Sequence, residues 1–327
     1  MINKQYSISC IRLIALLLIV TNHVMKYFDL VLSGWFVVGV QIFLCISGYL
    51  YGGRDISDIP SFVNKRIKKV LIPYFITFIT VAILQFILVK DQIDLYRFLG
   101  GLVLRETLVG GEHLWFIPII LICYAVLVLL DAYKKKYVKD RDSFFIFSII
   151  AVIAAFIVFH CFSFGCADRV ICFVIGYCLG VNDNKQYVPE KLFLGMFLII
   201  ALLGNGLQIY YDCLGTQAIP ESLLANYGLF IAYNHVTFGI TIFILLKLLF
   251  EKMQFKPSVH RFLDISDEYS YETYLVHQFV ILGPLSLMNI TPCIPLNLLI
   301  VISVVIMSAF LLKLINDCIS PKAKINS

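Results

Sequence analysis

Ten long apolar runs are the feature that most constrains the fold of this chain of 327 residues. An α-helix needs about 20 mostly apolar residues to cross the hydrocarbon core of a bilayer. The runs cover residues 8–29, 34–52, 71–89, 115–132, 143–161, 167–182, 192–210, 227–249, 270–288 and 295–316. Since a bilayer core holds no water, each spanning segment must satisfy its backbone internally, as a helix does. The sequence therefore predicts an all-α, polytopic integral membrane protein with about ten transmembrane helices, in one domain over residues 1–327.

Composition excludes the main soluble classes. Only 14% of the residues are charged and 60% are hydrophobic, whereas roughly 25% are charged in an ordinary soluble domain. This balance excludes a soluble enzyme, a disordered chain and a secreted module held together by disulfides. The ten cysteines are scattered through the apolar runs without a CxxC pair. We interpret them as packing residues and expect no metal site.

The distribution of basic residues predicts the orientation of the chain. With the N-terminus in the cytoplasm and ten alternating spans, 20 of the 26 Lys and Arg residues fall inside and five outside. Cytoplasmic loops of membrane proteins carry such an excess. The pattern predicts that both termini are cytoplasmic. The stretch at residues 93–109 is amphipathic, which favours an interfacial or re-entrant helix.

Two ionisable residues, Arg12 and His23, lie in the first apolar run. Eleven residues of helix place them on the same face, about 16 Å apart along the axis. An ionisable group inside a span is costly and by default suggests a function. The alternative is an arginine that extends to the inner interface and a packed histidine near the outer one. The spacing alone leaves both interpretations open.

The second run contains Gln41, Ser47 and Gly48. Small residues let neighbouring membrane helices approach closely, and a serine can form hydrogen bonds between helices. We favour a packing role for this segment over a catalytic one.

A cluster of four cations, Lys65, Arg66, Lys68 and Lys69, precedes the third run and is expected in a loop. Such clusters fix topology and contact anionic lipids. They can also hold the phosphates of a cytosolic, nucleotide-bearing donor. The residues alone leave both roles open.

Further polar groups stand near the fourth and ninth runs. Glu112, His113 and Trp115 precede the fourth run, where a tryptophan is usually an interface anchor. In the ninth run Tyr274 and His277 are three residues apart and therefore share a helical face. His160, Asn234 and His235 are interpreted as internal hydrogen-bond partners.

Taken in order, these motifs resemble the integral-membrane acyltransferase-3 family, which contains bacterial surface-polysaccharide O-acyltransferases. The similar elements are Arg12-x10-His23, the segment 41–49 (its FFxxSGF), Arg66-x-x-Lys69 before Pro73-Tyr74, His113 to Phe116 (its HLWF), Phe173 to Gly176 (its FxxG) and Ser270 to His277 (its SYxxYLxH). Two positions depart from the family pattern. Ser9 stands where many members have Asp, and Lys69 stands where a second Arg is usual. A lysine keeps the charge but loses bidentate phosphate recognition.

The resemblance implies a membrane-embedded O-acyltransferase of the bacterial cytoplasmic (inner) membrane. It would move an acyl group, first of all acetyl, from cytosolic acyl-CoA to a hydroxyl of an exported surface glycan or lipid-linked oligosaccharide. His23 is then the base, and Arg12, Arg66 and Lys69 hold the donor. The side chains expected on the acceptor side are Glu112, His113, Trp115, Tyr274, His277 and Ser47. We expect no permanently bound cofactor, no nucleic acid and no extramembrane esterase-like domain, while monomer and homodimer both stay open.

Other functions are compatible with the same architecture. A polytopic transporter or a lipid-linked glycan flippase also has buried ionisable residues and basic inner loops. The ordered motifs and the lack of an evident internal repeat favour the enzyme. Two further alternatives stay open. One is an acyltransferase that passes its acyl group to a separate outer-face protein, and the other is a non-catalytic scaffold. Retention of Arg12 and His23 speaks against the scaffold.

Overall fold

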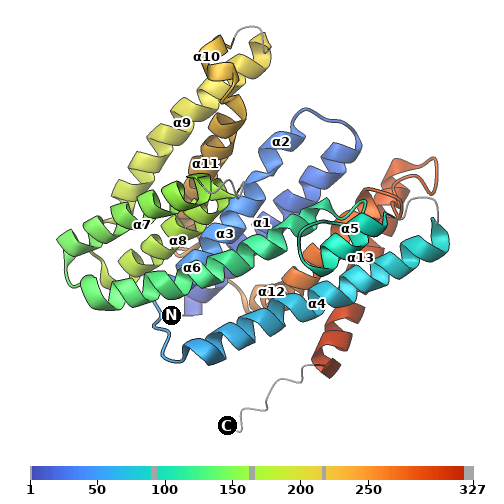
Figure 1. Ribbon diagram of the computed structural model, residues 1–327, viewed down its shortest axis with the longest axis horizontal. Coiled ribbons are helices and arrows are strands. Elements are labelled where there is room, and N and C mark those ends of the chain that lie inside the picture. The colour runs from blue at the N-terminus through green and yellow to red at the C-terminus, as the bar shows by residue number, and fades with distance from the viewer. Residues whose placement is uncertain (1, 90–93, 162–165, 216–218, 320–327) are drawn as a thin grey trace. The chain divides into compact units, whose positions relative to one another are not determined.

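The computed structural model describes residues 2–89, 94–161, 166–215 and 219–319 (Figure 1). Within these ranges the regular structure is helical throughout. The long helices are α1 (Ile2–Tyr27), α3 (Val38–Gly52), α4 (Ile59–Leu88), α6 (Phe116–Tyr137), α7 (Arg141–Cys161), α8 (Ala167–Lys185), α9 (Glu190–Leu214), α11 (Tyr227–Phe250), α12 (Pro257–Ile281) and α13 (Ile294–Ile319). Short helical segments are α2 (Ser33–Phe36), α5 (Leu95–Leu102), the 3₁₀ helix η2 (Glu112–Trp115) and α10 (Glu221–Leu224). The predicted all-α class is confirmed.

Eight helical segments of the described chain are long and apolar enough to cross a membrane. The long helices outside this set are α8 and α12, which match the predicted runs 167–182 and 270–288. Both carry several charged residues, and in α12 most of these lie in the N-terminal half. The predicted end of the ninth run is wrong, because α12 stops at Ile281. Gly283 follows with a φ of +81° and then Pro284, and neither residue favours continuation of a helix.

The third long helix begins earlier than the hydropathy predicts. Asp58 caps α4 by accepting a hydrogen bond from the backbone N–H of Ser61 at 3.0 Å. The helix starts at Ile59, so the cations at residues 65–69 lie on its first turns and not in a loop. Lysine and arginine are good helix formers. The helix therefore includes the charged residues that precede the apolar run.

The chain divides into two compact units. The first consists of Met1–Ile19, Gly34–Ser57 and Ile122–His260. The second consists of Val20–Ser33, Asp58–Leu121 and the chain from Arg261 onward. Helix α1 therefore contributes its first part to one unit and its last part to the other.

The predicted charge distribution also counts three lysines that lie outside the described residues, namely Lys90, Lys322 and Lys324.

In the first unit, α3 and α8 run in backbone contact (Figure 1). A Cβ atom at Gly48 would lie 2.0 Å from the carbonyl oxygen of Phe173, and one at Gly176 would lie 2.2 Å from that of Cys45. Small residues permit this approach in a membrane helix pair. The Ser47 hydroxyl donates to the Phe43 carbonyl of its own helix at 2.8 Å. The segment thus serves helix packing.

A buried ion cluster joins α8, α9 and α11 in the same unit. The Lys247 ammonium lies 2.6 Å from Glu190, 3.1 Å from Asp183 and 3.1 Å from Glu251. Tyr49 donates to Asp183 at 2.7 Å. Lys247, which is one of the 20 basic residues counted as inside, lies within the predicted run 227–249 and is a buried side chain of α11. A buried charge of this kind is tolerated only when it is paired.

The second unit is built on α4, α12 and α13. Helix α13 packs on α4, and a core forms around Ile281, Met288, Val301 and Val305. The Tyr271 hydroxyl of α12 donates to the Val70 carbonyl of α4 at 2.8 Å. The amphipathic stretch 93–109 contains the eight-residue helix α5, which lies against α4.

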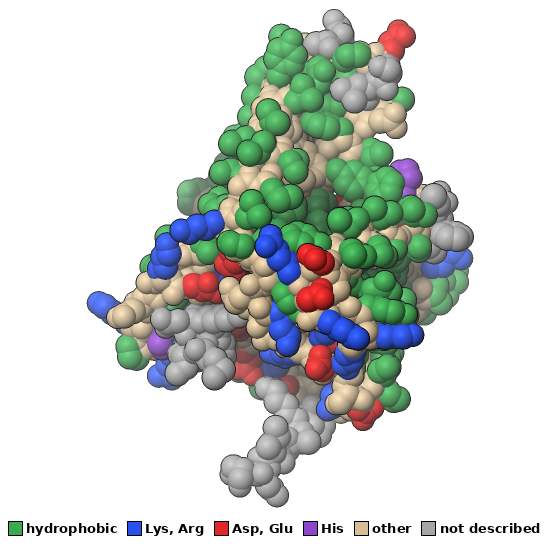
Figure 2. All heavy atoms as spheres, turned by 90° about the vertical axis from the view of Figure 1, so that its left-hand side faces the viewer, with side chains coloured by type: hydrophobic (Ala, Val, Ile, Leu, Met, Phe, Trp, Pro, Cys, Tyr) green, Lys and Arg blue, Asp and Glu red, His purple; other side chains and the backbone are tan. Residues whose placement is uncertain are grey.

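Apolar side chains are widely exposed. Figure 2 shows hydrophobic side chains over much of one face, with charged side chains gathered in its lower part. Helix α9 leaves Leu202 and Leu203 64% and 70% exposed. Apolar surface on this scale marks contact with a partner or a membrane. A helix that faces lipid needs no polar outer side.

Candidate active site

Three histidines from distant parts of the sequence meet in the second unit. His23 lies near the end of α1, His113 in η2 and His277 on α12. The ring centroids of His23 and His277 are 5.1 Å apart, and those of His113 and His277 are 5.0 Å apart. His23 and His113 are separated by 6.3 Å. We refer to these three residues as the histidine cluster.

Glycines let η2 approach α12. Gly110 adopts a φ of +78°, which a residue with a side chain rarely adopts. A Cβ atom at Gly111 would lie 2.6 Å from the ring of Phe279. The turn at these two residues can therefore bring His113 against the helix that carries His277.

Backbone carbonyls orient two of the rings. Nδ1 of His277 lies 2.7 Å from the Tyr274 carbonyl, and Nε2 of His113 lies 3.1 Å from the Leu275 carbonyl. A carbonyl oxygen only accepts hydrogen bonds, so each of these nitrogens carries the proton in the neutral ring. The lone pairs are then at Nε2 of His277 and Nδ1 of His113.

The remaining ring nitrogens are available for chemistry. Nε2 of His277, Nδ1 of His113 and Nδ1 of His23 are buried, and none has a hydrogen-bond partner within the described chain. Almost every buried polar group in a folded protein is hydrogen-bonded. Three exceptions in one cluster therefore point to a site that acts on a ligand. His23 is 8% exposed and His277 is fully buried, so His23 is the more accessible of the two.

A hydrogen-bonded frame surrounds His113. Gln278 donates to Glu112 at 2.7 Å and accepts from the backbone N–H of His113 at 3.2 Å. Tyr274 donates to the His113 carbonyl at 2.5 Å. Glu112 accepts from the N–H of Gly110 at 3.1 Å. Gln278 was not among the predicted site residues; its only sequence signal is an amide within an apolar run.

The structure brings some predicted residues together and leaves others elsewhere. Glu112, Tyr274 and the histidine cluster form one group, and the half-buried Trp115 follows in η2. Arg66 and Lys69 lie on the first turns of α4, where the Arg66 guanidinium stands 5.6 Å from the Phe62 ring centroid. The predicted residues that fall in the first unit are Arg12 and Ser47.

The cluster provides neutral imidazoles that can accept a proton and share it. Histidine is the commonest general base because its ordinary pKa lies near neutrality. Over the described residues, no group of three or more His, Cys, Asp or Glu side chains is arranged to hold a metal ion. Because a neutral imidazole keeps a lone pair on one ring nitrogen, the cluster is suited to accept a proton from a hydroxyl group.

Comparison with known proteins supplies the family. The model of the acyltransferase-3 family, described as an acyltransferase domain, matches residues 5–314. No curated protein matches the chain. No solved structure matches it either. The matched range contains Arg12, His23, Arg66, His113 and His277 in the order expected from the motifs. The chain therefore belongs to the acyltransferase-3 family of multi-pass membrane acyltransferases.

Proposed function

We propose that this protein is a membrane O-acyltransferase that moves an acyl group, first of all acetyl, from cytosolic acyl-CoA to a hydroxyl of an exported cell-surface glycan. The observation that carries the proposal is the buried histidine cluster with its unpartnered ring nitrogens. Such a cluster offers a base where the family motifs require one.

His23 is the proposed base. It is the most exposed ring of the cluster, and neither His113 nor His277 can turn without breaking a bond to a carbonyl. The acceptor hydroxyl transfers its proton to His23 while its oxygen bonds to the thioester carbonyl carbon. The tetrahedral intermediate then breaks its carbon–sulfur bond, and the departing CoA thiolate takes the proton back.

Basic side chains of α1 and α4 are proposed to hold the donor. Arg66 and Lys69 lie on the first turns of α4, and Arg12 precedes His23 by eleven residues of α1. That spacing corresponds to about 16 Å along the helix, a distance that an extended pantetheine arm can cover. With both termini in the cytoplasm, the phosphates would be bound at the inner face and the thioester would reach toward the outer one.

The test is transfer of radiolabel from acetyl-CoA in membranes supplied with the host's surface glycans. We compare the wild type with His23→Ala and with His160→Ala, a matched change at an exposed residue of α7. Label should enter glycan with the wild type and with His160→Ala, and should be lost with His23→Ala at equal expression. Label with His23→Ala would overturn the assignment of the base. Translocation of glycan without transfer of label to it would overturn the proposal of an enzyme in favour of a transporter.

A further inference from the structure

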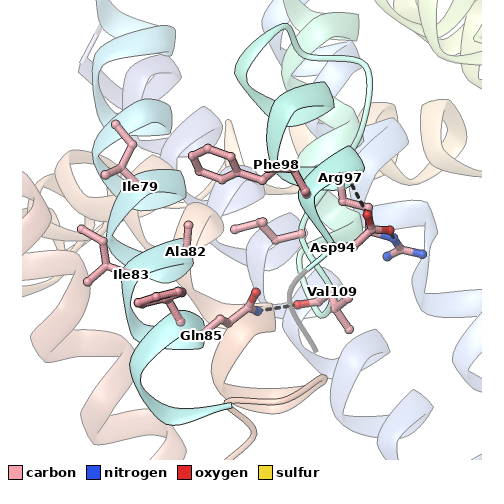
Figure 3. A pocket seen from close by; sticks show the side chains of 11 residues that line it. Ile79, Ala82, Ile83, Gln85, Asp94, Arg97, Phe98 and Val109 are labelled. Carbon is pink, nitrogen blue, oxygen red and sulfur yellow. Dashed lines mark hydrogen bonds and ion pairs between the residues drawn. The ribbon is translucent and has the colours of Figure 1, made fainter. Parts of the chain in front are cut away.

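An apolar groove lies between α4 and α5 in the second unit (Figure 3). Its volume is about 280 Å³, at the lower limit for pockets that enclose a drug-sized ligand. One wall is formed by side chains of α4, including Ile79, Ala82 and Ile83, and the opposite wall by Leu95 and Phe98. We call it the α4–α5 groove. A groove of this size suits one hydrocarbon chain better than a whole small molecule.

Stacked aromatic rings close one end of the groove. Phe78 stacks on Tyr74 within α4 and on Phe98 of α5, with ring centroids 5.7 Å apart in each pair. Tyr74 donates to the Gly101 carbonyl at 2.8 Å. These contacts fasten α5 to α4 on the side of Tyr74. The groove therefore lies toward the C-terminal end of α4, around Ala82 to Phe86.

The floor of the groove offers few hydrogen-bond partners to water. Gln85 is 4% exposed, and its side-chain amide donates to the Val109 carbonyl at 2.8 Å. The neighbouring floor residue, Leu108, is apolar and buried. A water molecule needs two to four polar partners to occupy a cavity. Hydrocarbon is the occupant that matches this lining.

One end of the groove is polar. Asp94 caps α5 by accepting from the backbone N–H of Tyr96 at 2.9 Å, and the Nε atom of Arg97 lies 3.7 Å from its carboxylate. The Arg97 side chain is 41% exposed, and Figure 3 shows its guanidinium beside Asp94 at the start of α5. A guanidinium has five N–H donors in a fork that suits phosphate. The ion pair with Asp94 uses only part of this capacity.

The floor is close to the histidine cluster along the chain. Val109 precedes His113 by four residues, so their Cα atoms are at most about 14 Å apart. The basic residues proposed for the donor are remote, because Lys69 and Ile83 are separated by fourteen residues of α4, or about 21 Å. The groove is thus associated with the acceptor side of the reaction and not with the donor phosphates.

We propose that the α4–α5 groove holds the hydrocarbon chain of a lipid-tethered acceptor, with the phosphate that joins this chain to the glycan at Arg97. This inference rests on the proposed function and specifies its acceptor. The glycan would extend from the phosphate toward the histidine cluster.

Binding is tested first, on the purified full-length protein in lipid nanodiscs, with a photoreactive hexadecyl phosphate. Ala82→Trp fills the groove, and Leu84→Trp places the same side chain on an exposed position of α4 outside it. Labelling of α4 and α5 peptides should fall at least tenfold with Ala82→Trp and persist with Leu84→Trp. Arg97→Gln should weaken labelling by the phosphate but not by photoreactive hexadecanol. Absence of label in these peptides, or its displacement by equimolar phosphatidylglycerol, would overturn the proposal.

A kinetic experiment distinguishes failure of the groove proposal from failure of the proposed function. Ala82→Trp should raise KM at least tenfold for a lipid-tethered acceptor and leave KM for the same glycan without a lipid unchanged. Equal effects on both acceptors, or on neither, would overturn the groove assignment while the acyltransferase stands. Labelling of the groove without transfer to either acceptor by the wild type would overturn the acyltransferase and, with it, the acceptor role of the groove.

Discussion

The backbone contact between α3 and α8 gives a sharp prediction for Gly176→Ala. The new Cβ atom would lie 2.2 Å from the carbonyl oxygen of Cys45 and 2.8 Å from its Cα, whereas ordinary contacts of a Cβ begin at 3.4 Å. Because both neighbours are backbone atoms, no side chain can turn away. The helices must instead separate by about 1 Å.

The size of the effect follows from two opposing terms. Overpacking a close contact costs about 1–3 kcal/mol, and we expect the upper end because the loss of contact extends along the whole helix pair. Replacing glycine by alanine inside a helix gains about 1 kcal/mol. Gly176→Ala should therefore lower the free energy of unfolding by about 2 kcal/mol.

Gly206→Ala on α9 is the matched control, since nothing lies within 4 Å of a Cβ atom built there. This variant keeps the gain in helix propensity without the clash. The difference between the two variants isolates the clash, at about 3 kcal/mol. The measurement is unfolding in mixed micelles with increasing SDS, followed by circular dichroism and size exclusion. Equal stability of the two variants would refute the backbone contact.

Three further predictions concern other parts of the protein. Lys247→Met leaves the three partly buried carboxylates of Asp183, Glu190 and Glu251 without their cation and should cost about 3 kcal/mol in the same unfolding assay; a loss below about 1 kcal/mol would contradict a stabilising role for this ion cluster. Arg66→Ala should raise KM for acetyl-CoA about tenfold at unchanged acceptor KM, measured as initial rates of label transfer, and an unchanged donor KM would contradict phosphate binding. Gln278→Leu removes the bonds that hold Glu112 and the backbone of His113, so kcat should fall about 10–100-fold with donor KM unaltered; an unchanged kcat would show that this frame does not position the ring.

The apolar runs predicted the fold class because their length is dictated by the bilayer. The apolar runs did not predict the start of a helix whose first turns contain charged residues. The cations at residues 65–69 belong to α4, since a helix tolerates lysine and arginine that a hydropathy pattern assigns to a loop. The ion cluster of Lys247 could not be predicted from the pattern either, because its partners Asp183 and Glu190 lie 64 and 57 residues away in the sequence.

His23 and His277 each stood out in the sequence as ionisable groups in apolar runs, and the ordered motifs indicated the family that the match over residues 5–314 then confirmed. Their meeting with His113 could not be derived from spacing, because 90 residues separate His23 from His113 and 164 separate His113 from His277. Only the tertiary structure decided which ring nitrogens are committed to carbonyls and which stay unpartnered. The physical reason is that periodicity specifies the face of one helix, whereas ring orientation depends on backbone atoms supplied by another.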